Sequence, residues 1–407
     1  MIVGIIGGGA SGMAAALAAA KNPNTQVFLM ERQARLGRKL LATGNGRCNL
    51  TNLHTAPHRY HGSDSRFVCD ALDALDVSGT LQWFESLGLV TVAEASGKVY
   101  PYSDQANSVV DVLRLALQKE NIQIFTGFEV KKVRRCGEEF EVSDGEQNLR
   151  CDRLIIACGG LAGTKLGGSL SGYKLLKKFG HSCTALRPSL VQVKTSWPGI
   201  TALKGVRANC HARIFRDDAL FAESTGELQF TEFGLSGPVI FEISRDACYG
   251  DGSWVCRLDL LPQCSAEKLY SLLCQKRETE LTADELLTGI LHNRLGRVVT
   301  KEAGISPNSP IARLSDDALR SVCLLVKDFP VTLSEPLGMD SAQVTAGGML
   351  TGEFDPETME SKLVPGLYAC GEVLDIDGDC GGYNLQWAWS SGRLAGLHAG
   401  GIHDQNS

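Results

Sequence analysis

A run of glycines directly after the first apolar segment constrains this chain more than any other feature. Residues 1–6 are almost wholly apolar, and Gly7-Gly8-Gly9-Ala10-Ser11-Gly12 follows them before an alanine-rich stretch. This order predicts a buried strand, a tight turn and a helix. Gly7 permits the turn, Gly9 lets the backbone approach a pyrophosphate, and Gly12 lets the helix pack on the strand. The N–H groups that open the helix would face the phosphates.

A carboxylate at the expected separation strengthens this interpretation. Residues 26–30 form a second apolar segment that ends at Glu31, nineteen residues after Gly12 (31 − 12). A carboxylate in this place accepts hydrogen bonds from an adenosine ribose and repels a 2′-phosphate. The start of the chain therefore predicts a dinucleotide-binding strand–helix–strand unit, although it does not separate NAD from FAD.

A second glycine-rich segment, near the C-terminus, favours FAD. A short strand at 367–369 runs into Gly371-Glu372, and Gly381-Gly382-Tyr383-Asn384 then opens a helix that continues toward Leu397. A protein that only binds NAD needs no second loop of this kind, whereas a flavin site does. The start of that helix would face the flavin ring, where its dipole stabilises negative charge on the reduced ring.

A third segment has the composition of a loop that lies against a flat ring. Gly37-Arg38-Lys39 and Thr43–Asn49 combine small residues, which let the backbone approach closely, with cations that can offset phosphate charge. Within this segment, Cys48 is either a catalytic thiol or a residue packed beside the flavin.

With these segments in view, the chain resembles the HI0933-like family of bacterial flavoproteins, also labelled BaiN-type or aminoacetone-oxidase-type. The resemblance covers almost the whole chain and rests on the strings GRKLLATGNGRCNLTN, GELQFTEFGLSGP, VTAGG and GLYACGEVLDIDGDCGGYNLQWAWSSG. It implies non-covalently bound FAD. The contacts that it implies are Gly7, Gly9, Ala10, Ser11, Gly12, Glu31, Arg32, Lys39, Asn45, Gly46, Arg47, Cys48, Asn49, Val130, Gly159, Gly371, Glu372, Gly382, Tyr383, Asn384 and Leu385.

A change of pattern in the middle of the chain indicates an insertion. Buried, glycine-punctuated segments at both ends enclose a region of short alternating segments. We therefore predict an α/β fold whose Rossmann-like FAD-binding domain is glutathione-reductase-like and three-layered, with an inserted antiparallel β subdomain and a small helical subdomain. The predicted ranges are 1–187 and 340–407 for the FAD-binding domain and 188–339 for the insertion, which is β-rich at 188–262 and 326–339 and helical at 263–325.

Local patterns predict individual elements. Helices are expected at 67–75 and 79–87, at 266–277 behind the N-cap Ser265, and at 283–291 behind the N-cap Thr282. A continuous strand is expected over 122–133.

Composition bounds the remaining possibilities. The net charge of −6 (40 − 46) argues against broad electrostatic binding to nucleic acid or anionic membranes. Residues 2–20 carry no charge, but glycines interrupt them and no basic segment precedes them, so we expect neither a signal peptide nor a membrane span and predict a cytoplasmic protein. The 14 cysteines contain no CxxC pair, and His54, His58 and His61 are typical of a polar loop, so no metal site is predicted.

The reaction is less constrained than the cofactor. No second GxGxxG marks a separate NAD(P)H domain, although NAD(P)H remains possible as a transient reductant. The family labels leave three activities open: reduction of an activated C=C, oxidation of small amines such as aminoacetone, and reduction of uridine in ribosomal RNA. The substrate is thus a small molecule or an RNA base, and candidate proton donors are Tyr383, Arg47 and Cys48.

A further hypothesis is an RNA-binding protein with a structural flavin. It requires a basic groove in the inserted domain, for which the candidate residues are Lys204, Arg207, Arg213 and Arg216, although these residues are also typical of a solvated strand face.

Overall fold

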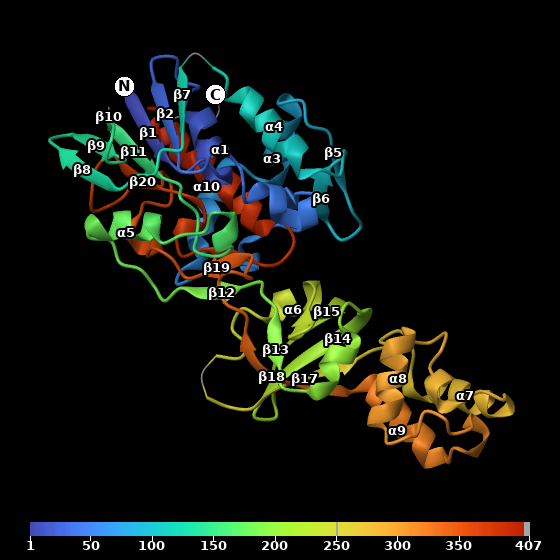
Figure 1. Cartoon of the computed structure of the whole chain (residues 1–407). Coiled ribbons are helices and arrows are strands. Elements are labelled where there is room, and N and C mark those ends of the chain that lie inside the picture. Colours follow the sequence, from blue (N-terminus) through green and yellow to red (C-terminus); the bar gives the residue numbers. More distant parts are fainter. Residues whose placement is uncertain (120, 250, 403–407) are drawn as a thin grey trace. The chain divides into compact units, whose positions relative to one another are not determined.

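The computed structural model describes residues 1–119, 121–249 and 251–402 (Figure 1). Its chain divides into two compact units. The first comprises Met1–Arg187 together with the chain from Gln343 onward, and the second comprises Pro188–Ala342. The insertion predicted from the sequence spans 188–339. Strand β12 (Arg187–Ser189) contains the first boundary.

A parallel sheet of five strands forms the centre of the first unit, in the order β20-β11-β1-β2-β7 (Figure 1). All neighbouring strands run parallel. Its strands are almost continuously apolar because both faces of the sheet are covered, and Ile5 and Leu29 are fully buried. The strands are β1 (Ile2–Ile6), β2 (Gln26–Glu31), β7 (Ile122–Thr126), β11 (Arg153–Ile156) and β20 (Leu367–Ala369).

Two helices, α1 (Ala10–Ala19) and α10 (Tyr383–Ala399), lie side by side with their backbones in contact. A Cβ added at Gly392 would lie 2.3 Å from the carbonyl oxygen of Ser11, and one added at Gly396 would lie 2.3 Å from that of Ala15. Because successive contacts advance in the same direction along both helices, α1 and α10 run parallel. Glycine is required at these crossings because a side chain there would force the helices apart.

Smaller elements complete the first unit. An antiparallel meander of β8 (Lys132–Cys136), β9 (Glu139–Ser143) and β10 (Asn148–Cys151) packs its Phe140 and Val142 into the same core as the parallel sheet. Helices, sheet and meander form the predicted three-layer arrangement. The other elements are β3 (Thr51–Asn52), β4 (Tyr60–His61), α2 (Val68–Ala74), α3 (Val77–Ser86), β5 (Thr91–Ala93), β6 (Lys98–Pro101), α4 (Ala106–Ala116), α5 (Ser171–Lys178), β19 (Val344–Ala346) and β21 (Asp377–Gly378).

The prediction of one strand over 122–133 is wrong. The chain leaves the parallel sheet after Thr126, and Gly127 adopts a φ of +72°, which a strand does not permit. The chain then re-enters β structure in the meander at Lys132. The helices predicted at 67–75 and 79–87 are confirmed as α2 and α3, whereas α4 and α5 were not predicted.

The second unit contains a closed antiparallel barrel, in the order β13-β16-β15-β14-β17-β18. Its alternating segments point one face inward, where Cys210, Ala212 and Ile214 of β14 are fully buried. The strands are β13 (Val193–Thr195), β14 (Arg207–Arg216), β15 (Ala219–Phe230), β16 (Gly234–Ser236), β17 (Trp254–Asp259) and β18 (Phe329–Pro336), and α6 (Pro238–Ile243) follows β16.

Three helices lie between β17 and β18 in the sequence: α7 (Ala266–Gln275), α8 (Asn293–Glu302) and α9 (Asp316–Lys327). Ser265 caps α7 as predicted, since its side chain accepts a hydrogen bond from the N–H of Lys268. The helix predicted at 283–291 is wrong: Thr282 forms a capping box, but only a single 3₁₀ turn follows it, and Gly289 has a φ of +81°. Within the described ranges, no helix combines the length and apolar character needed to span a membrane.

Candidate cofactor and active site

The five parallel strands of the first unit end at one edge of the sheet, and the predicted contact residues follow these ends. Gly7 follows β1, Glu31 ends β2, Gly159 follows β11 and Gly371 follows β20. Gly7, Glu31, Arg32 and Val130 together line a cavity of about 60 Å³ at this edge. The carboxyl edge of a parallel sheet is the usual place of a nucleotide, because loops from several strands converge there.

The glycine loop is built by close backbone contacts. Gly7 has a φ of +111°, and a Cβ there would lie 2.4 Å from the carbonyl oxygen of Ala157. A Cβ on Gly12 would lie 1.8 Å from the carbonyl oxygen of Gly7. At Gly9, by contrast, an added Cβ meets no described atom within 4 Å. Gly7 and Gly12 are therefore required by the protein itself, whereas Gly9 faces open space at the start of α1.

Glu31 is held in a fixed position. Its Oε2 accepts a hydrogen bond of 2.8 Å from the N–H of Gly8, and its Oε1 accepts one of 2.7 Å from the N–H of Gln33. An ionised carboxylate has about four acceptor sites, so Glu31 can still bind a ribose. The glycine loop and the Glu31 carboxylate are thus joined by hydrogen bonds of the protein itself.

The N-termini of the parallel helices α1 and α10 are offset from each other along the helix direction. Ser11 lies opposite Gly392. Ser11 is one residue from the start of α1 and Gly392 is nine residues from the start of α10, so the N-terminus of α10 extends eight residues (9 − 1), or about 12 Å of helix rise, beyond that of α1. In the described chain, no side chain caps either N-terminus. Both therefore offer unpaired N–H groups and a partial positive charge, and the two N-termini are offset along the helix direction.

An ion pair connects Lys39 and Glu372, two of the predicted cofactor contacts. The Nζ of Lys39 lies 2.7 Å from the Oε2 of Glu372, and both side chains are partly buried. The Oε1 of Glu372 accepts a hydrogen bond from the N–H of Thr345. Glu372 consequently balances the charge of Lys39. A phosphate near Lys39 would interact with this ion pair and not with an isolated cation.

The loop predicted to face the ring has strained backbone. Asn45 and Cys48 have positive φ angles of 58° and 63°, which L-residues rarely adopt. A Cβ added at Gly382 would lie 2.5 Å from the carbonyl oxygen of Thr51 and 2.9 Å from the Oδ1 of Asn49. The Gly44–Asn49 loop and the start of α10 are therefore adjacent, although they are distant in sequence.

Asn49 provides a test of whether this site fits a flavin. Its side chain is buried, and its Oδ1 has no hydrogen-bond partner among the described residues. A buried acceptor without a donor is costly, so a native structure normally supplies one from a ligand or water. The flavin pyrimidine carries an N–H donor, and at Gly9, where a pyrophosphate would approach the backbone, an added Cβ meets no described atom within 4 Å. The residues present therefore fit FAD.

Of the three predicted proton donors, two have unsuitable surroundings. Burial raises the pKa of the Cys48 thiol to about 12, so it holds its proton at neutral pH. Arg47 forms ion pairs with Glu94 and Asp104, which raise its pKa further. Tyr383 is buried at the first turn of α10, and its carbonyl oxygen accepts a hydrogen bond of 3.1 Å from the Tyr60 hydroxyl.

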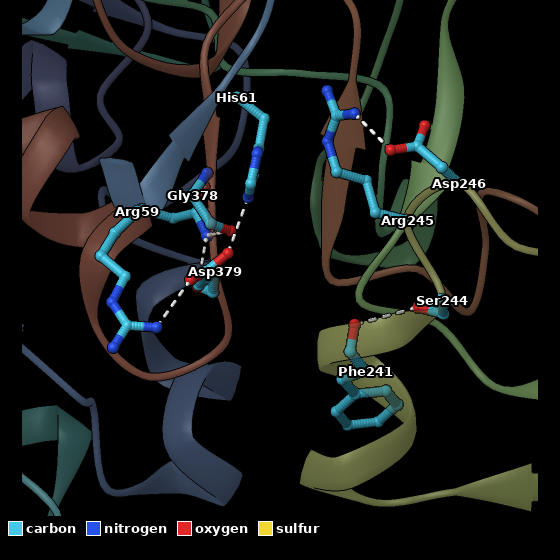
Figure 2. A network of polar contacts seen from close by, with 9 residues as sticks. Arg59, His61, Phe241, Ser244, Arg245, Asp246, Gly378 and Asp379 are labelled. Carbon is cyan, nitrogen blue, oxygen red and sulfur yellow. Dashed lines mark hydrogen bonds and ion pairs between the residues drawn. The ribbon is translucent and has the colours of Figure 1, made fainter. Parts of the chain in front are cut away.

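The structure adds a charged cluster that sequence reasoning missed: Arg59, His61 and Asp379 (Figure 2). The Nε2 of His61 lies 2.7 Å from one oxygen of Asp379, and a guanidinium nitrogen of Arg59 lies 3.2 Å from the other. Asp379 belongs to the C-terminal glycine-rich segment, but His61 is 318 residues away in the sequence. No local signal pairs them, and the sequence placed His61 in a polar loop.

The basic residues proposed for RNA binding are each offset by an acidic neighbour in the second unit. Lys204 pairs with Glu232 at 2.5 Å, Arg207 with Glu227 at 3.2 Å, and Arg213 with Asp328 at 2.8 Å. Arg216 lies 3.9 Å from a carboxylate oxygen of Asp217. These ion pairs give no support to the basic groove that the RNA-binding hypothesis requires and agree with a solvated strand face.

A family model, the HI0933-like protein Rossmann domain, matches residues 1–398 of this sequence. The chain belongs to the HI0933-like family. It is an FAD-dependent oxidoreductase, as the C-terminal segment and the resemblance predicted.

Two curated relatives and one solved structure are similar over nearly the full chain. The 3-dehydro-bile acid delta(4,6)-reductase of Clostridium scindens is 40% identical over 98% of both chains. The ribosomal RNA dihydrouridine synthase of Escherichia coli K12 is 30% identical over 95% of both. The structure of 3-ketosteroid delta1-dehydrogenase from Sterolibacterium denitrificans superposes with a TM-score of 0.50 at 12% identity, covering 98% of this chain and 99% of that one, and shows the shared fold.

Proposed function

We propose that this enzyme reduces an activated C=C bond of an unsaturated substrate with hydride from reduced FAD, and that NAD(P)H supplies the electrons. The observation that carries this proposal is the full-length similarity, at 40% identity, to a bile acid delta(4,6)-reductase. The substrate class that follows is a small molecule in which a carbonyl group is conjugated with the C=C bond, because conjugation makes the far carbon an acceptor for hydride.

The proposed cofactor contacts are the predicted ones. Gly7–Gly12 and the start of α1 would hold the pyrophosphate, Glu31 the adenosine ribose, and the Asn45–Asn49 loop with Gly382–Leu385 the ring. Bound FAD would supply the hydride, while the chain orients it and keeps water from the reacting atoms. The strand ends, the uncapped helices and the unpartnered Asn49 acceptor support this assignment.

The test separates the two halves of the reaction under anaerobic conditions. The FAD-loaded protein is reduced with NADH or NADPH and then mixed with a conjugated steroid enone or with air-saturated buffer. In a separate assay, the oxidised protein is mixed with aminoacetone in air, and oxygen consumption is followed. We expect rapid reoxidation by the enone and slow reoxidation by oxygen. Fast oxygen consumption with aminoacetone and no reaction with the enone would instead identify the amine oxidase, the alternative activity.

Reduction of uridine in ribosomal RNA is the second candidate function, because a relative with that role is 30% identical over 95% of the chain. The neutralised barrel surface gives no support to a broad RNA contact. Mass spectrometry of ribosomal RNA incubated with the reduced enzyme decides the matter: a gain of two hydrogens at uridine supports this candidate.

We also propose that the protein acts in a reducing cytoplasm. The described cysteines include no disulfide, and several, such as Cys210 and Cys256, are buried in apolar surroundings.

A further inference from the structure

Reduction of a conjugated C=C needs a proton as well as a hydride. One carbon receives the hydride, and the other must receive a proton from a positioned acid. Cys48 and Arg47 are weak acids, because burial raises the pKa of the thiol to about 12 and Arg47 is ion-paired with Glu94 and Asp104. On the proposed function, Tyr383 remains one candidate donor at the first turn of α10, and the cluster of Arg59, His61 and Asp379 offers another acid.

The hydrogen bonds of this cluster determine which nitrogen of His61 is free to act. Burial works to raise the pKa of Asp379, but hydrogen bonds and charge from His61 and Arg59 outweigh it and hold that pKa below its ordinary value. Because Asp379 is ionised, the Nε2 of His61, 2.7 Å away, carries a proton and donates it to the carboxylate. The Nδ1 has no hydrogen-bond partner in the described chain, and the side chain is about one-third exposed.

The cluster lies on the segment that leads into α10. Strand β4 pairs with β21, so that His61 lies opposite Asp377 and Tyr60 lies opposite Gly378. The Asn384 side chain exchanges two hydrogen bonds of 2.8 Å with the backbone of Gly378. The hydrogen bond from Tyr60 to the Tyr383 carbonyl also joins this ribbon to the first residue of α10. His61 is therefore fixed relative to the helix end that is expected to face the flavin ring.

Charged side chains from two elements surround His61. From its own segment it faces Arg59, and across the ribbon it faces Asp379 and the buried Asp377. Asp375 accepts a hydrogen bond from the nearby N–H of Ser63. Because Arg59 also binds Asp379, the carboxylate stays ionised after His61 has lost a proton, and the Nε2–H is retained.

We propose that His61 is the proton donor for reduction of the C=C bond and that Asp379 is its positioning residue. The hydride forms a C–H bond at one carbon, and the π electron pair moves to the other carbon and takes the proton from Nδ1. The N–H electron pair remains on Nδ1, which leaves a neutral imidazole with its proton on Nε2. The two electrons gained by the substrate come from reduced FAD, which returns to the oxidised form.

The experiment compares His61→Gln with His211→Gln. Glutamine keeps a nitrogen that can bind Asp379 but cannot act as an acid. His211 is a matched control because it pairs with Glu223 at 3.2 Å on the barrel. In stopped-flow assays with a conjugated enone, we expect His61→Gln to slow enone reduction about 10²-fold or more. Flavin reduction by NAD(P)H or dithionite should change less than about threefold, and His211→Gln should match wild type in both halves.

Two readouts distinguish a proton donor from a merely structural ion pair. In wild type, the rate of enone reduction should fall as the solution becomes more basic, and His61→Gln should lose this pH dependence. Nitrogen NMR of the oxidised protein should show His61 protonated at Nε2 when neutral, a preference that Asp379→Asn removes. The wild-type pH dependence persisting in His61→Gln, or a neutral His61 protonated at Nδ1, overturns the inference.

The outcomes also separate this inference from the proposed function. A wild-type enzyme that is reduced but never transfers hydride to an enone contradicts the function itself. An active wild type together with an equally active His61→Gln contradicts only the role of His61.

Discussion

The two ends of the candidate site are built by different means. At the nucleotide end, Gly7 and Gly12 bring backbone atoms together at distances that exclude any side chain. At the ring end, Arg59, His61 and Asp379 hold two distant segments together through charged side chains. The nucleotide end depends on residues that lack a side chain, whereas the ring end depends on charged side chains.

This difference determines how each end responds to change. A backbone contact does not depend on pH but tolerates no added atom, because a buried Cβ has nowhere to move. A charged cluster tolerates changes in size more readily but depends on protonation, since each pKa reflects its neighbours. Substitutions at the two ends should therefore fail in different ways.

The largest effect is expected for Gly12→Ala. Its Cβ would lie 1.8 Å from the carbonyl oxygen of Gly7, so strand β1 and helix α1 must separate. We expect a loss of about 3 kcal/mol or more in stability of the FAD-free protein, measured by urea denaturation. Gly352→Ala is the control, because an added Cβ there meets no described atom within 4 Å. Equal stability of the two variants would contradict the close packing of the loop.

Gly9→Ala should separate cofactor binding from folding. Gly9 has an ordinary φ of −82°, and its Cβ would project into open space, so the FAD-free protein should keep its stability within about 0.5 kcal/mol. FAD affinity should fall about tenfold or more, because the methyl group occupies space needed by the pyrophosphate. Quenching of flavin fluorescence on binding measures the affinity. An unchanged affinity would show that the pyrophosphate lies elsewhere.

Asp379→Asn should change the acid sensitivity of the ring end. The folded-state pKa of Asp379 is depressed, so its contribution to stability is present above the ordinary value of about 3.9 and is lost as pH falls through the lower, folded-state pKa. The melting temperature of wild type should therefore fall more steeply below about pH 4 than that of Asp379→Asn. Asp73→Asn, at an exposed position of α2, should behave as wild type. Parallel curves for all three proteins would refute the coupling.

The smallest effect is expected for Cys48→Ala. The thiol is fully buried and its pKa is about 12, so it supplies no thiolate at neutral pH. Enone reduction should change less than about threefold, since general acid catalysis by a group contributes about 10² or more. Iodoacetamide should leave Cys48 unmodified in the native protein, as peptide mass spectrometry can establish. A loss of 10²-fold in rate would restore Cys48 as the proton donor.

The nucleotide end could be predicted because its determinants are local. Gly7, Gly12 and Glu31 act through a turn, a helix start and a strand end that lie within one strand–helix–strand unit. The predicted strand over 122–133 and the predicted helix over 283–291 were wrong because a glycine with positive φ lies within each segment. Gly127 ended a strand that the apolar pattern continued, and Gly289 lies in the segment expected to be one helix.

The ring end could not be predicted in the same way. Arg59 and His61 are ordinary loop residues in the sequence, and their relation to Asp379 depends on β4 meeting β21. The offset between the N-termini of α1 and α10 could not be predicted either, because it depends on the contacts of Gly392 and Gly396 with α1.

By itself, then, the sequence determined the cofactor class, the glycine loop and the glycine-rich start of α10, because these depend on backbone freedom within short segments. Only the tertiary structure decided which charged side chains meet beside that helix and which basic residues of the barrel are neutralised. Such pairings join residues far apart in the chain, and their distances follow from packing that no local pattern records.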